Sequence, residues 1–420
     1  MKVLIDKSEI KGKVTAPPSK SYTIRGLMCA ALARGKSEVI NPLTAEDTQA
    51  AANILGQVGI RVLQQDSLWK VTGSTFHQPD ADLFCGESAA TLRFMMAICS
   101  LIPGRRRLVT GPSLARRPVK PLIQALKQLG VNCSSQGEVA PVTVEGGRLK
   151  GGVVELPGDV SSQFVSALLL ISPLAEEGVT IRLTTLPESK PFILMTLDCL
   201  KEFGVKAEYT KDLREFTVSR QTYKPTRYEV EGDWSSASYF LALGALSGEV
   251  EVGNLHLQSR QGDKMIIKFL KDMGASVQTN RNSFTVRKSA LKAIRADLSD
   301  CIDLLPTMAV LAAVAEGVSE LIGIDRARLK ESDRVAAVKE GLARMKIKVI
   351  EERDRLAIAG SAPKGSTIDP RGDHRLAMAF GILGTKVGET VIDDAGCVAK
   401  TYPRFWEELK SIGGEVKINE

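Results

Sequence analysis

One pattern occurs six times along the chain. A turn rich in Gly, Ser and Asp leads directly into a helix of small apolar residues, and a second helix follows it. The first helices of the six copies start near Ser19, Gly86, Gly158, Gly232, Asp303 and Gly372. The glycines that end four of the second helices are 71, 74 and 70 residues apart: Gly59, Gly130, Gly204 and Gly274. A fixed period of this length indicates one supersecondary unit used repeatedly.

Each copy reads as strand, helix, strand, helix and then two strands. The first helices are apolar almost all round, as expected of buried helices, whereas the second helices have charged faces. A chain of 420 residues exceeds the size at which one core keeps growing, so two domains are expected. The predicted fold is therefore α/β, with three βαβαββ repeats in each domain, parallel helices buried inside and sheets outside.

The composition is that of an ordinary globular protein, with 44% hydrophobic and 25% charged residues, and it excludes disorder. The apolar runs are too short to span a membrane and the first residues lack a signal peptide's apolar region, so we expect a cytoplasmic protein. The seven cysteines show no CxxC spacing, and there are only three histidines. This pattern favours buried reduced thiols over disulfides or metal ligands.

The net charge is +7, and the basic residues are dispersed among acidic ones. This balance favours small anionic substrates over a nucleic acid, which would need a basic stripe. Aromatic residues make up only 5% of the chain, too few for platforms on which bases stack. We therefore expect small-molecule partners, and neither nucleic acid nor a membrane.

Serines precede or begin several first helices, where unpaired N–H groups and the helix dipole attract anions. They are Ser19, Ser21, Ser161 and Ser162. A plain helix cap explains each serine taken singly. Charged neighbours favour a ligand instead, because charges within apolar repeats are costly unless they meet a partner. These neighbours are Lys20, Arg25, Arg93, Asp373, His374 and Arg375.

A second set of charges lies near the starts of the second helices. Arg117, Arg334 and Lys400 occupy nearly the same phase of the second, fifth and sixth repeats, and Lys330 and Glu331 precede Arg334. A solvated helix start is the alternative interpretation. Recurrence at equivalent positions favours one shared cationic cavity, since arginine forks suit carboxylate and phosphate oxygens. The substrates should carry several negative charges.

Seven segments, in this order, resemble those of the 5-enolpyruvylshikimate-3-phosphate synthase family: PPSKSYTIR, GPSLARRPVKPLIQAL, GDVSSQFVSALL, VEGDWSSASYFLA, RLKESDRV, GDHRLAMAF and CVAKTYPRF. Several independent motifs in register are more specific than one signature. The resemblance implies a two-domain inside-out α/β barrel with three βαβαββ units per domain. It also implies that residues 1–19 and 232–420 form domain I, that residues 20–231 form domain II, and that the active site lies in the cleft between them.

Members of that family move the enolpyruvyl group of phosphoenolpyruvate to the 5-hydroxyl of shikimate 3-phosphate and release phosphate, without a metal or organic cofactor. The resemblance therefore implies no cofactor here and two sets of binding residues. Shikimate 3-phosphate would be held by Lys20, Ser21, Arg25, Ser161, Ser162, Gln163, Ser189, Asp303 and Lys330. Phosphoenolpyruvate would contact Lys20, Ala89, Arg117, Gln163, Arg334, Arg375 and Lys400. We expect a monomer, although the sequence leaves the oligomeric state open.

Three residues would be catalytic by the same resemblance. Asp303 would accept the proton of the 5-hydroxyl, Glu331 would take part in proton transfer at the methylene carbon, and Lys20 would act as an acid toward the leaving phosphate. For the two carboxylates, capping of a helix start is the alternative explanation. Which group serves which step stays open, because positions and protonation states decide it.

The chain departs from the family pattern at a few positions. Ala89 stands where herbicide-sensitive members carry Gly, and its methyl group would crowd a longer inhibitor more than the natural substrate. The resemblance thus predicts reduced sensitivity to glyphosate. Glu87 replaces a common Asn of the same turn, with no evident effect, and Phe192 replaces a Tyr of some members. Arg326 stands where some members place an Asn that contacts substrate.

Other functions fit part of the pattern. UDP-N-acetylglucosamine enolpyruvyl transferases share the architecture but would need a Lys-Asn pair near the N-terminus and a reactive Cys in a mobile loop. This chain has SKS from Ser19, and the segment LVTGPSLARRP has no Cys. A non-catalytic phosphate-binding repeat protein would have no need of Asp303, Glu331 and Lys400 together. RNA-end cyclases share related repeats, but no nucleotide-attacking His motif is evident.

Overall fold

The computed structural model describes residues 1–73, 75–77 and 81–419. The chain forms two compact units, which are Met1–Pro17 with Gly232–Glu420 (unit 1) and Pro18–Glu231 (unit 2). The predicted first boundary, after Ser19, lies two residues later than the observed one. Ser19 belongs to unit 2 because its backbone N–H donates to the carbonyl of Glu231 at 2.8 Å and its side chain caps the first helix.

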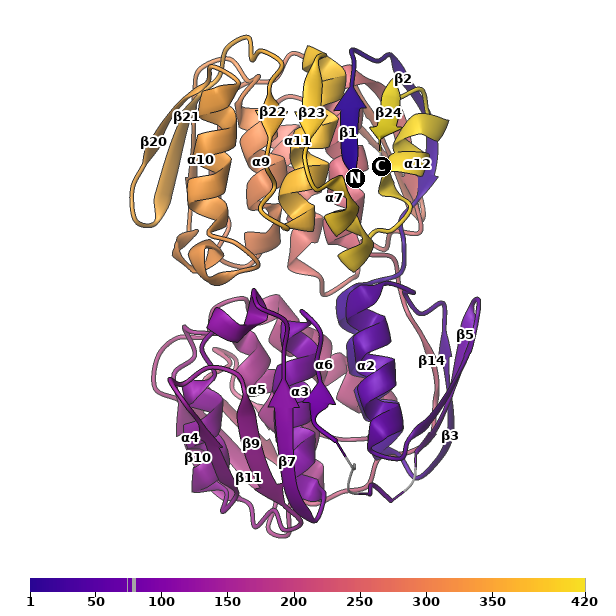
Figure 1. The fold of residues 1–420 in the computed structure, drawn as a ribbon, viewed down its shortest axis with the longest axis vertical. Helices are drawn as coiled ribbons and strands as arrows, with labels where there is room; N and C mark the ends of the chain where they lie inside the picture. Colours follow the sequence, from indigo (N-terminus) through magenta and orange to yellow (C-terminus); the bar gives the residue numbers. More distant parts are fainter. Residues whose placement is uncertain (74, 78–80, 420) are drawn as a thin grey trace. The chain divides into compact units, whose positions relative to one another are not determined.

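Unit 2 alternates helices with short strands (Figure 1). Its α-helices are α1 (Lys20–Leu32), α2 (Glu46–Gln57), α3 (Ala89–Ile98), α4 (Lys120–Gln128), α5 (Ser162–Ile171) and α6 (Lys190–Glu202). Its 3₁₀ helices are η1 (Cys99–Leu101), η2 (Leu114–Arg116) and η3 (Ser172–Leu174). Its strands are β3 (Gly35–Ile40), β4 (Arg61–Gln65), β5 (Leu68–Gly73), β6 (Leu83–Phe84), β7 (Gly104–Val109), β8 (Asn132–Ser135), β9 (Val142–Gly146), β10 (Gly152–Leu156), β11 (Val179–Leu183), β12 (Glu208–Tyr209), β13 (Glu215–Val218) and β14 (Arg227–Glu229).

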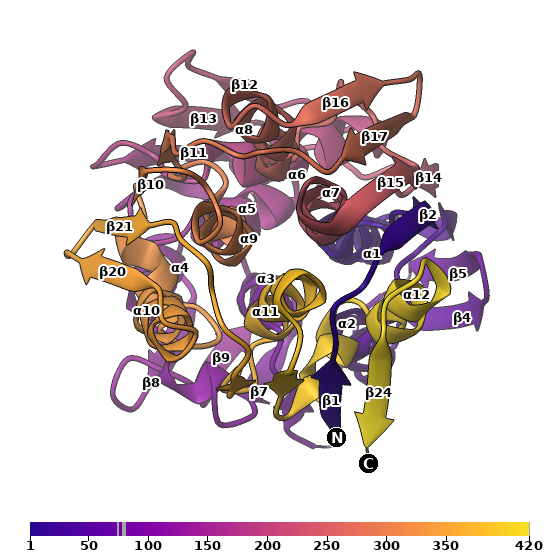
Figure 2. The same cartoon turned by 90° about the horizontal axis from the view of Figure 1, so that it is seen from above.

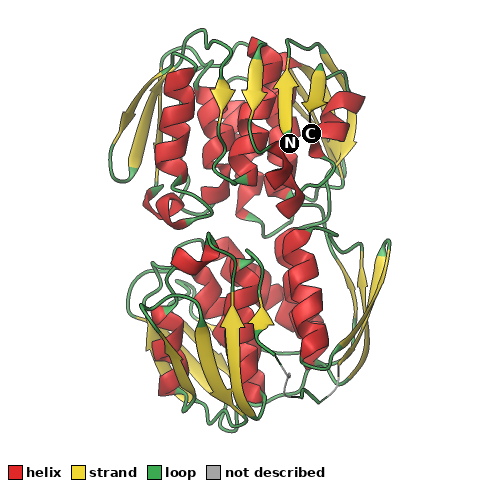
Figure 3. Cartoon of the chain, viewed as in Figure 1, coloured by secondary structure: helices red, strands yellow, loops and turns green. Residues whose placement is uncertain are grey.

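Unit 1 is built from the same kinds of element, as the colouring by secondary structure in Figure 3 shows. Its α-helices are α7 (Trp234–Ser247), α8 (Ile266–Asp272), α9 (Leu305–Ala312), α10 (Arg334–Arg344), α11 (His374–Val387) and α12 (Phe405–Ser411). Its 3₁₀ helices are η4 (Gly262–Met265), η5 (Ile302–Leu304), η6 (Asp325–Leu329) and η7 (Ala395–Lys400). Its strands are β1 (Lys2–Ile5), β2 (Ile10–Thr15), β15 (Gly248–Gly253), β16 (Ser276–Thr279), β17 (Ser283–Arg287), β18 (Arg295–Asp297), β19 (Val318–Ile322), β20 (Lys348–Glu351), β21 (Arg355–Ala359), β22 (Thr367–Ile368), β23 (Thr390–Ile392) and β24 (Val416–Asn419).

Every described strand belongs to a four-stranded sheet. The sheets of unit 2 have the orders β14-β3-β5-β4, β6-β7-β9-β8 and β10-β11-β13-β12, and those of unit 1 have the orders β16-β17-β15-β2, β18-β19-β21-β20 and β22-β23-β1-β24. In the sheet that contains β6, for example, β6 runs parallel to β7, whereas β9 is antiparallel to both β7 and β8. A helix connects the parallel pair, as a βαβ crossover requires. The predicted βαβαββ unit is therefore present.

Three strands complete sheets that are distant from them in the sequence. β2 precedes α1 along the chain but pairs with β15 of unit 1. The corresponding place beside β3 in unit 2 is taken by β14, which precedes α7. β1 pairs with both β23 and β24 near the other end of the chain. The chain thus passes between the units directly after β2 and again directly after β14.

The first helix of each repeat is buried, because small residues allow neighbouring elements to approach closely. All fourteen residues of α7 are buried. A Cβ atom at Gly244 would lie 2.5 Å from the carbonyl oxygen of Val286, so only glycine permits this contact with β17. Figure 2 shows α7, α9 and α11 side by side with the strands of unit 1 around them. No helix within the described ranges is long and apolar enough to cross a bilayer.

Candidate functional site

In each unit, polar side chains from several helices and from the turns before them gather into one group. In unit 2 we call the group formed by Arg25, Arg93, Ser161, Gln163 and Thr196 the arginine–serine cluster. In unit 1 we call the group formed by Asp303, Lys330, Glu331, Arg334, Asp373 and Arg375 the carboxylate–arginine cluster. The two clusters contain most of the residues that the sequence analysis selected, and each is described within its own unit.

Serine caps begin the three buried helices of unit 2. Ser19 accepts a hydrogen bond from the N–H of Tyr22, Ser88 accepts one from that of Thr91 and Ser161 accepts one from that of Gln163. The capping explanation is therefore correct for Ser19 and Ser161. It is incomplete for Ser161, whose hydroxyl also accepts a hydrogen bond from an arginine of the preceding repeat.

That arginine is Arg93, which links α3 to α5. Its Nη1 donates to Ser161 Oγ at 3.0 Å and to Gln163 Oε1 at 2.8 Å, and its Nη2 donates to the carbonyl of Pro118 at 3.4 Å. The guanidinium lies 4.8 Å from the ring centroid of Phe164, within cation–π range. Arg93 thus sets the positions of two predicted substrate-binding side chains, although the sequence analysis gave it no role of its own.

Arg25 is buried beneath the same surface. Its Nε donates to Thr196 Oγ1 at 2.8 Å, and its terminal nitrogens donate to the carbonyls of Ser21 and Phe192, both at 3.1 Å. No described carboxylate forms an ion pair with it, and burial lowers the pKa of its guanidinium. Arg25 therefore carries a desolvated positive charge that an anionic ligand would compensate.

Lys20 is the first residue of α1 and forms an ion pair with Asp47 at the start of α2, with 2.9 Å between Nζ and Oδ2. The Asp47 side chain is only 6% exposed. Asp47 was not predicted from the sequence, because its partner lies 27 residues earlier and no spacing rule links the two. Asp47 holds the Lys20 ammonium near the start of α1.

The remaining unit 2 candidates lie at helix starts but contribute in different ways. Ala89 and Ser162 are buried first residues of α3 and α5. Ser189 precedes α6 in the left-handed region at φ 50°, where its side chain forms no cap bond to the helix. A non-glycine residue in that region costs energy and is typical of functional sites.

Arg117, Arg334 and Lys400 differ in where they lie relative to the second helix of their repeats, although the sequence predicted nearly equivalent positions. Arg117 follows η2, three residues before α4 begins, whereas Arg334 is the first residue of α10 and Lys400 is the last residue of η7. The feature that they share is a 3₁₀ turn between a strand and the second helix of the repeat. The spacing from turn to helix varies, and sequence periodicity does not resolve such variation.

Asp303 lies in η5, directly before α9, and does not cap that helix. Its Oδ1 accepts a hydrogen bond from Arg334 Nη1 at 2.8 Å, and its Oδ2 accepts one from Arg375 Nη2 at 3.0 Å. Lys330 Nζ lies 3.5 Å from Oδ1. Burial by itself would raise the pKa of Asp303, but Arg375, Lys330 and Arg334 together hold it well below its ordinary value. The capping explanation for Asp303 is wrong.

Arg334 is at the centre of this cluster, with a side chain that is only 1% exposed. Besides Asp303, it donates to Asp373 Oδ2 at 2.7 Å and to Glu331 Oε2 at 2.6 Å. Asp373 and not Glu331 acts as a cap, at the start of α11, while Asp333 caps α10. Although burial opposes the charged form, the surrounding carboxylates raise the pKa of Arg334 above its ordinary value. Glu331 is therefore a partner of Arg334, and the capping explanation is wrong for it too.

Asp263 is a further buried acid that the sequence analysis missed. It lies in η4, is 3% exposed and accepts a hydrogen bond from Ser235 of α7. Burial and the nearby charge of Asp303 raise the pKa of Asp263 to about 7. η4 contacts η5, so this acid is a neighbour of the cluster.

Lys400 is buried in η7, which packs on α11. The thiol of Cys397 lies in the same 3₁₀ helix as Lys400. Burial raises the pKa of that thiol, which keeps it protonated and unreactive. The described residues include no group of three His, Cys, Asp or Glu side chains that could hold a metal ion.

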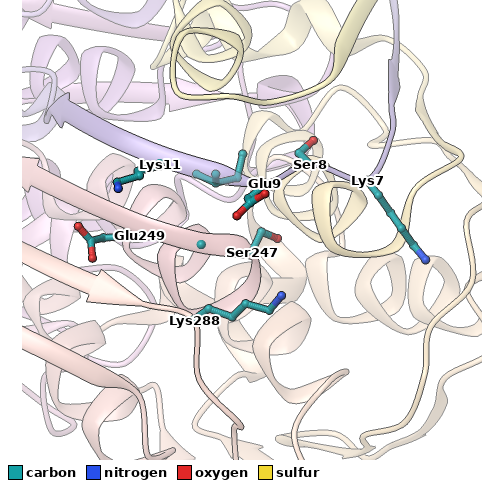
Figure 4. Close-up of a pocket in the computed structure, with 9 residues that line it drawn as sticks. Lys7, Ser8, Glu9, Lys11, Ser247, Glu249 and Lys288 are labelled. Carbon is teal, nitrogen blue, oxygen red and sulfur yellow. The ribbon is translucent and has the colours of Figure 1, made fainter.

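A hollow of about 650 Å³ on unit 1 lies away from this cluster (Figure 4). Ser247, at the carboxyl end of α7, is part of its lining. Asp263 lies near the amino end of α7, where it bonds Ser235. Because α7 has 14 residues, its two ends are about 20 Å apart. The side chains of Lys7 and Lys11 extend in opposite directions, so the lysines do not converge on one anion. We assign no role to this hollow.

Comparison with known proteins gives consistent matches over the whole chain. A family model described as EPSP synthase (3-phosphoshikimate 1-carboxyvinyltransferase) matches residues 5–409. The 3-phosphoshikimate 1-carboxyvinyltransferase of Dehalococcoides mccartyi (strain 195) is 50% identical over 418 residues, with 99% of both chains covered. That of Methanocaldococcus jannaschii is 39% identical over 418 residues, with 97% of both chains covered.

Solved structures show the same fold. An EPSP synthase from Acinetobacter baumannii superposes with a TM-score of 0.84 at 26% identity and covers 99% of this chain and 100% of its own. The enolpyruvyl transferase NikO from Streptomyces tendae superposes with a TM-score of 0.81 at 17% identity, with 99% and 98% covered, which shows the fold alone. The predicted α/β fold class is confirmed.

Proposed function

The chain belongs to the EPSP synthase family, and we infer that it transfers the enolpyruvyl group of phosphoenolpyruvate to the 5-hydroxyl of shikimate 3-phosphate. The observation that carries the site assignment is the pair of arginines that binds one buried carboxylate. Arg334 and Arg375 approach the two oxygens of Asp303 at 2.8 and 3.0 Å. Two guanidinium groups spaced for one carboxylate also suit the carboxylate of phosphoenolpyruvate.

This arrangement suggests how the base becomes active. A substrate carboxylate that binds Arg334 and Arg375 would compete with Asp303 for the same donors. Asp303 would then lose the cations that hold its pKa far below its ordinary value. With those contacts weakened, burial raises the pKa and makes Asp303 a better proton acceptor. Binding of phosphoenolpyruvate would thus prepare Asp303 to take the proton of the 5-hydroxyl.

The reaction then proceeds by addition and elimination. The 5-hydroxyl oxygen bonds to the central carbon of phosphoenolpyruvate and gives its proton to Asp303, while the methylene carbon gains a proton. The tetrahedral intermediate next loses phosphate and a proton from the methyl group, which restores the double bond. We propose Glu331 for proton transfer at the methylene carbon and Lys20 as the acid toward the leaving phosphate, as positioned acids and bases can supply about 10²–10⁴-fold each.

The arginine–serine cluster would bind shikimate 3-phosphate. Ser161, Ser162 and Ser189 would meet its phosphate, and Arg25 would compensate its charge with help from Lys20 and Ser21. Within unit 2, three features support this assignment: hydroxyl donors, helix N-termini and a buried Arg25 that forms no ion pair with any described carboxylate. Lys330 would complete the set from unit 1.

Phosphoenolpyruvate would have its phosphate near Arg117 and Lys400 and would contact Ala89 and Gln163. No described atom accepts a hydrogen bond from the buried Nε of Arg117, which supports an anion at that position. Because these residues come from both units, we propose that the units close on the substrates. We also propose a monomer that acts in the cytoplasm on these two small anions.

Phosphate release tests the function directly. The purified chain is incubated with phosphoenolpyruvate and either shikimate 3-phosphate or UDP-N-acetylglucosamine, and free phosphate is measured over time. We expect release with shikimate 3-phosphate only. Release with UDP-N-acetylglucosamine alone, or tight binding without release, would overturn the proposal.

A further inference from the structure

We propose that Glu87 is a positioning residue that fixes Arg117 for the phosphate of phosphoenolpyruvate. This inference rests on the proposed function of Arg117. Glu87, to which the sequence alone assigned no role, follows the turn at Gly86 and precedes the capping residue Ser88 of α3. The structure gives its carboxylate a specific set of partners in a different loop.

Glu87 joins two loops that leave the same edge of one sheet. β6 and β7 are parallel neighbours, so the loop after each strand begins at the same edge. The first loop carries Glu87 and leads into α3, and the second leads through η2 to Arg117. The N–H of Gly111 donates to the carbonyl of Gly86 at 2.9 Å, which places the loops side by side.

The Glu87 carboxylate performs the capping that η2 lacks in its own sequence. Its Oε2 accepts hydrogen bonds from Ser113 Oγ at 2.6 Å and from the N–H of Leu114 at 2.8 Å, and its Oε1 accepts one from the N–H of Ser113 at 3.2 Å. Ser113 precedes η2 but makes no side-chain cap bond to it. Its hydroxyl donates to Glu87 instead, so the first turn of η2 is held by a residue of the neighbouring loop.

The space around Glu87 is closely filled. A Cβ atom at Gly111 would lie 2.3 Å from Glu87 Oε1. Glycine at this position lets the carboxylate lie against the backbone of the second loop, whereas a larger residue would displace it. Moving the loops apart would break the hydrogen bonds of Glu87.

A short backbone path leads from Glu87 to Arg117. Leu114 donates its N–H to Glu87, and its carbonyl accepts the N–H of Arg117 at 3.0 Å. On the other side of Arg117, the carbonyl of Pro118 accepts a hydrogen bond from Arg93 at 3.4 Å. Arg117 is thus held from both sides, and its side chain is buried with an Nε that no described atom bonds.

We call the hydrogen bonds of Glu87 with Ser113 and Leu114 the Glu87 clamp. This clamp also links Arg117 to Ala89. Ala89 begins α3 two residues after Glu87, and it is a proposed contact of phosphoenolpyruvate. Glu87 therefore fixes the spacing between this helix start and the arginine that would hold the substrate phosphate. Loosening the clamp should weaken binding of phosphoenolpyruvate and leave the shikimate 3-phosphate residues in place.

The test is Glu87→Gln, which keeps the size of the side chain but replaces one acceptor oxygen with an amide donor. The N–H of Leu114 or of Ser113 would then face a donor. We expect KM for phosphoenolpyruvate to rise about tenfold, because the loss of one charge-assisted hydrogen bond has about this effect. KM for shikimate 3-phosphate should change less than about twofold. Inorganic phosphate, as an inhibitor competitive with phosphoenolpyruvate, should weaken in parallel.

Glu176→Gln is the matched control. Glu176 also accepts three hydrogen bonds, but from Arg148 on the exposed surface of unit 2, so neither KM should change. In an Arg117→Met background, Glu87→Gln should cause little further loss, because it acts through Arg117.

Each outcome bears on one proposal only. If wild type releases no phosphate with the two substrates, the proposed function fails. If wild type turns over but Glu87→Gln leaves both KM values unchanged, raises both equally or adds its full effect to Arg117→Met, the positioning role of Glu87 is refuted. Should Glu87→Gln not fold, Gly111→Ala, which crowds the same carboxylate, tests the clamp by the same measurements.

Discussion

The hydrogen bond between Arg93 and Gln163 should be energetically coupled to catalysis. Gln163 is a proposed contact of both substrates, and Arg93 Nη1 donates to its Oε1 at 2.8 Å. Arg93 is 5% exposed, so water replaces this bond poorly. Arg93→Met retains most of the apolar stem but removes the donor, and Gln163→Leu removes the acceptor at similar size.

The geometry sets the size of the expected coupling. A hydrogen bond to a charged group contributes about 1.5–3 kcal/mol. Arg93 Nη1 also donates to Ser161 Oγ at 3.0 Å, and Gln163 is only partly buried, so the lower end applies. A coupling of about 1.5 kcal/mol corresponds to roughly a tenfold departure from additivity in kcat/KM.

The assay is a double-mutant cycle on kcat/KM for shikimate 3-phosphate, measured by phosphate release for wild type, both single variants and the double variant. The cycle cancels the direct effect of Gln163 on the substrate and isolates the interaction free energy between Arg93 and Gln163. The control cycle pairs Gln163→Leu with Arg148→Met, because the Arg148 side chain is 76% exposed and bonds Glu176.

We expect the control cycle to be additive within about 0.5 kcal/mol. If the Arg93–Gln163 cycle is equally additive, the hydrogen bond does not orient Gln163 for the reaction and the reasoning fails. A coupling present in the thermal stability but absent from kcat/KM would also refute it, since the bond would then serve the fold alone.

Three further predictions concern single positions. Arg25→Met should remove the thermal stabilisation that shikimate 3-phosphate gives the wild type, because the buried charge of Arg25 has no described carboxylate partner; an unchanged ligand-induced shift in Tm would contradict this. Ala89→Gly should increase inhibition by glyphosate with little change in KM for phosphoenolpyruvate. Equal inhibition of the wild type and the variant would contradict this prediction. Asp263 has its pKa raised to about 7, so the stability that it contributes is present at pH 4 and is lost as the pH rises through 7. Asp263→Asn, which keeps an acceptor for Ser235, should therefore gain stability relative to wild type between pH 5 and pH 8 in urea unfolding, and a constant difference would contradict the assignment.

The repeat is the part of the fold that the sequence predicted well. Small-residue helices buried on most sides and charged second helices are local patterns, and local patterns can be read from one sequence. The partners of β2 and β14 are not local. β2 pairs with β15 more than two hundred residues later, and only the resemblance placed the N-terminal strand with the second half of the chain. Strand pairing over such distances depends on tertiary packing.

The candidate site divides in the same way. The serines were selected because they precede or begin apolar helices, and the arginines because charges within apolar repeats are costly. The structure brings Arg93, Ser161 and Gln163 together. Glu87 and Asp47 were missed as partners because each bonds a residue about 26 residues away. For a lone acid in a turn, the capping explanation was the reasonable one, and it was wrong for Asp303 because three cations surround it.

The two units differ in whether their buried arginines are paired with carboxylates. In unit 2, Arg25 has no described carboxylate partner, so a bound anion would meet an uncompensated charge and gain the full interaction. In unit 1, Asp303, Glu331 and Asp373 already neutralise Arg334, so a substrate carboxylate gains only what it wins in competition with Asp303. Interactions that strengthen ground-state binding do not by themselves accelerate a reaction. Unit 2 would therefore supply most of the affinity, whereas in unit 1 part of the binding energy of phosphoenolpyruvate would be used to free Asp303 as a base.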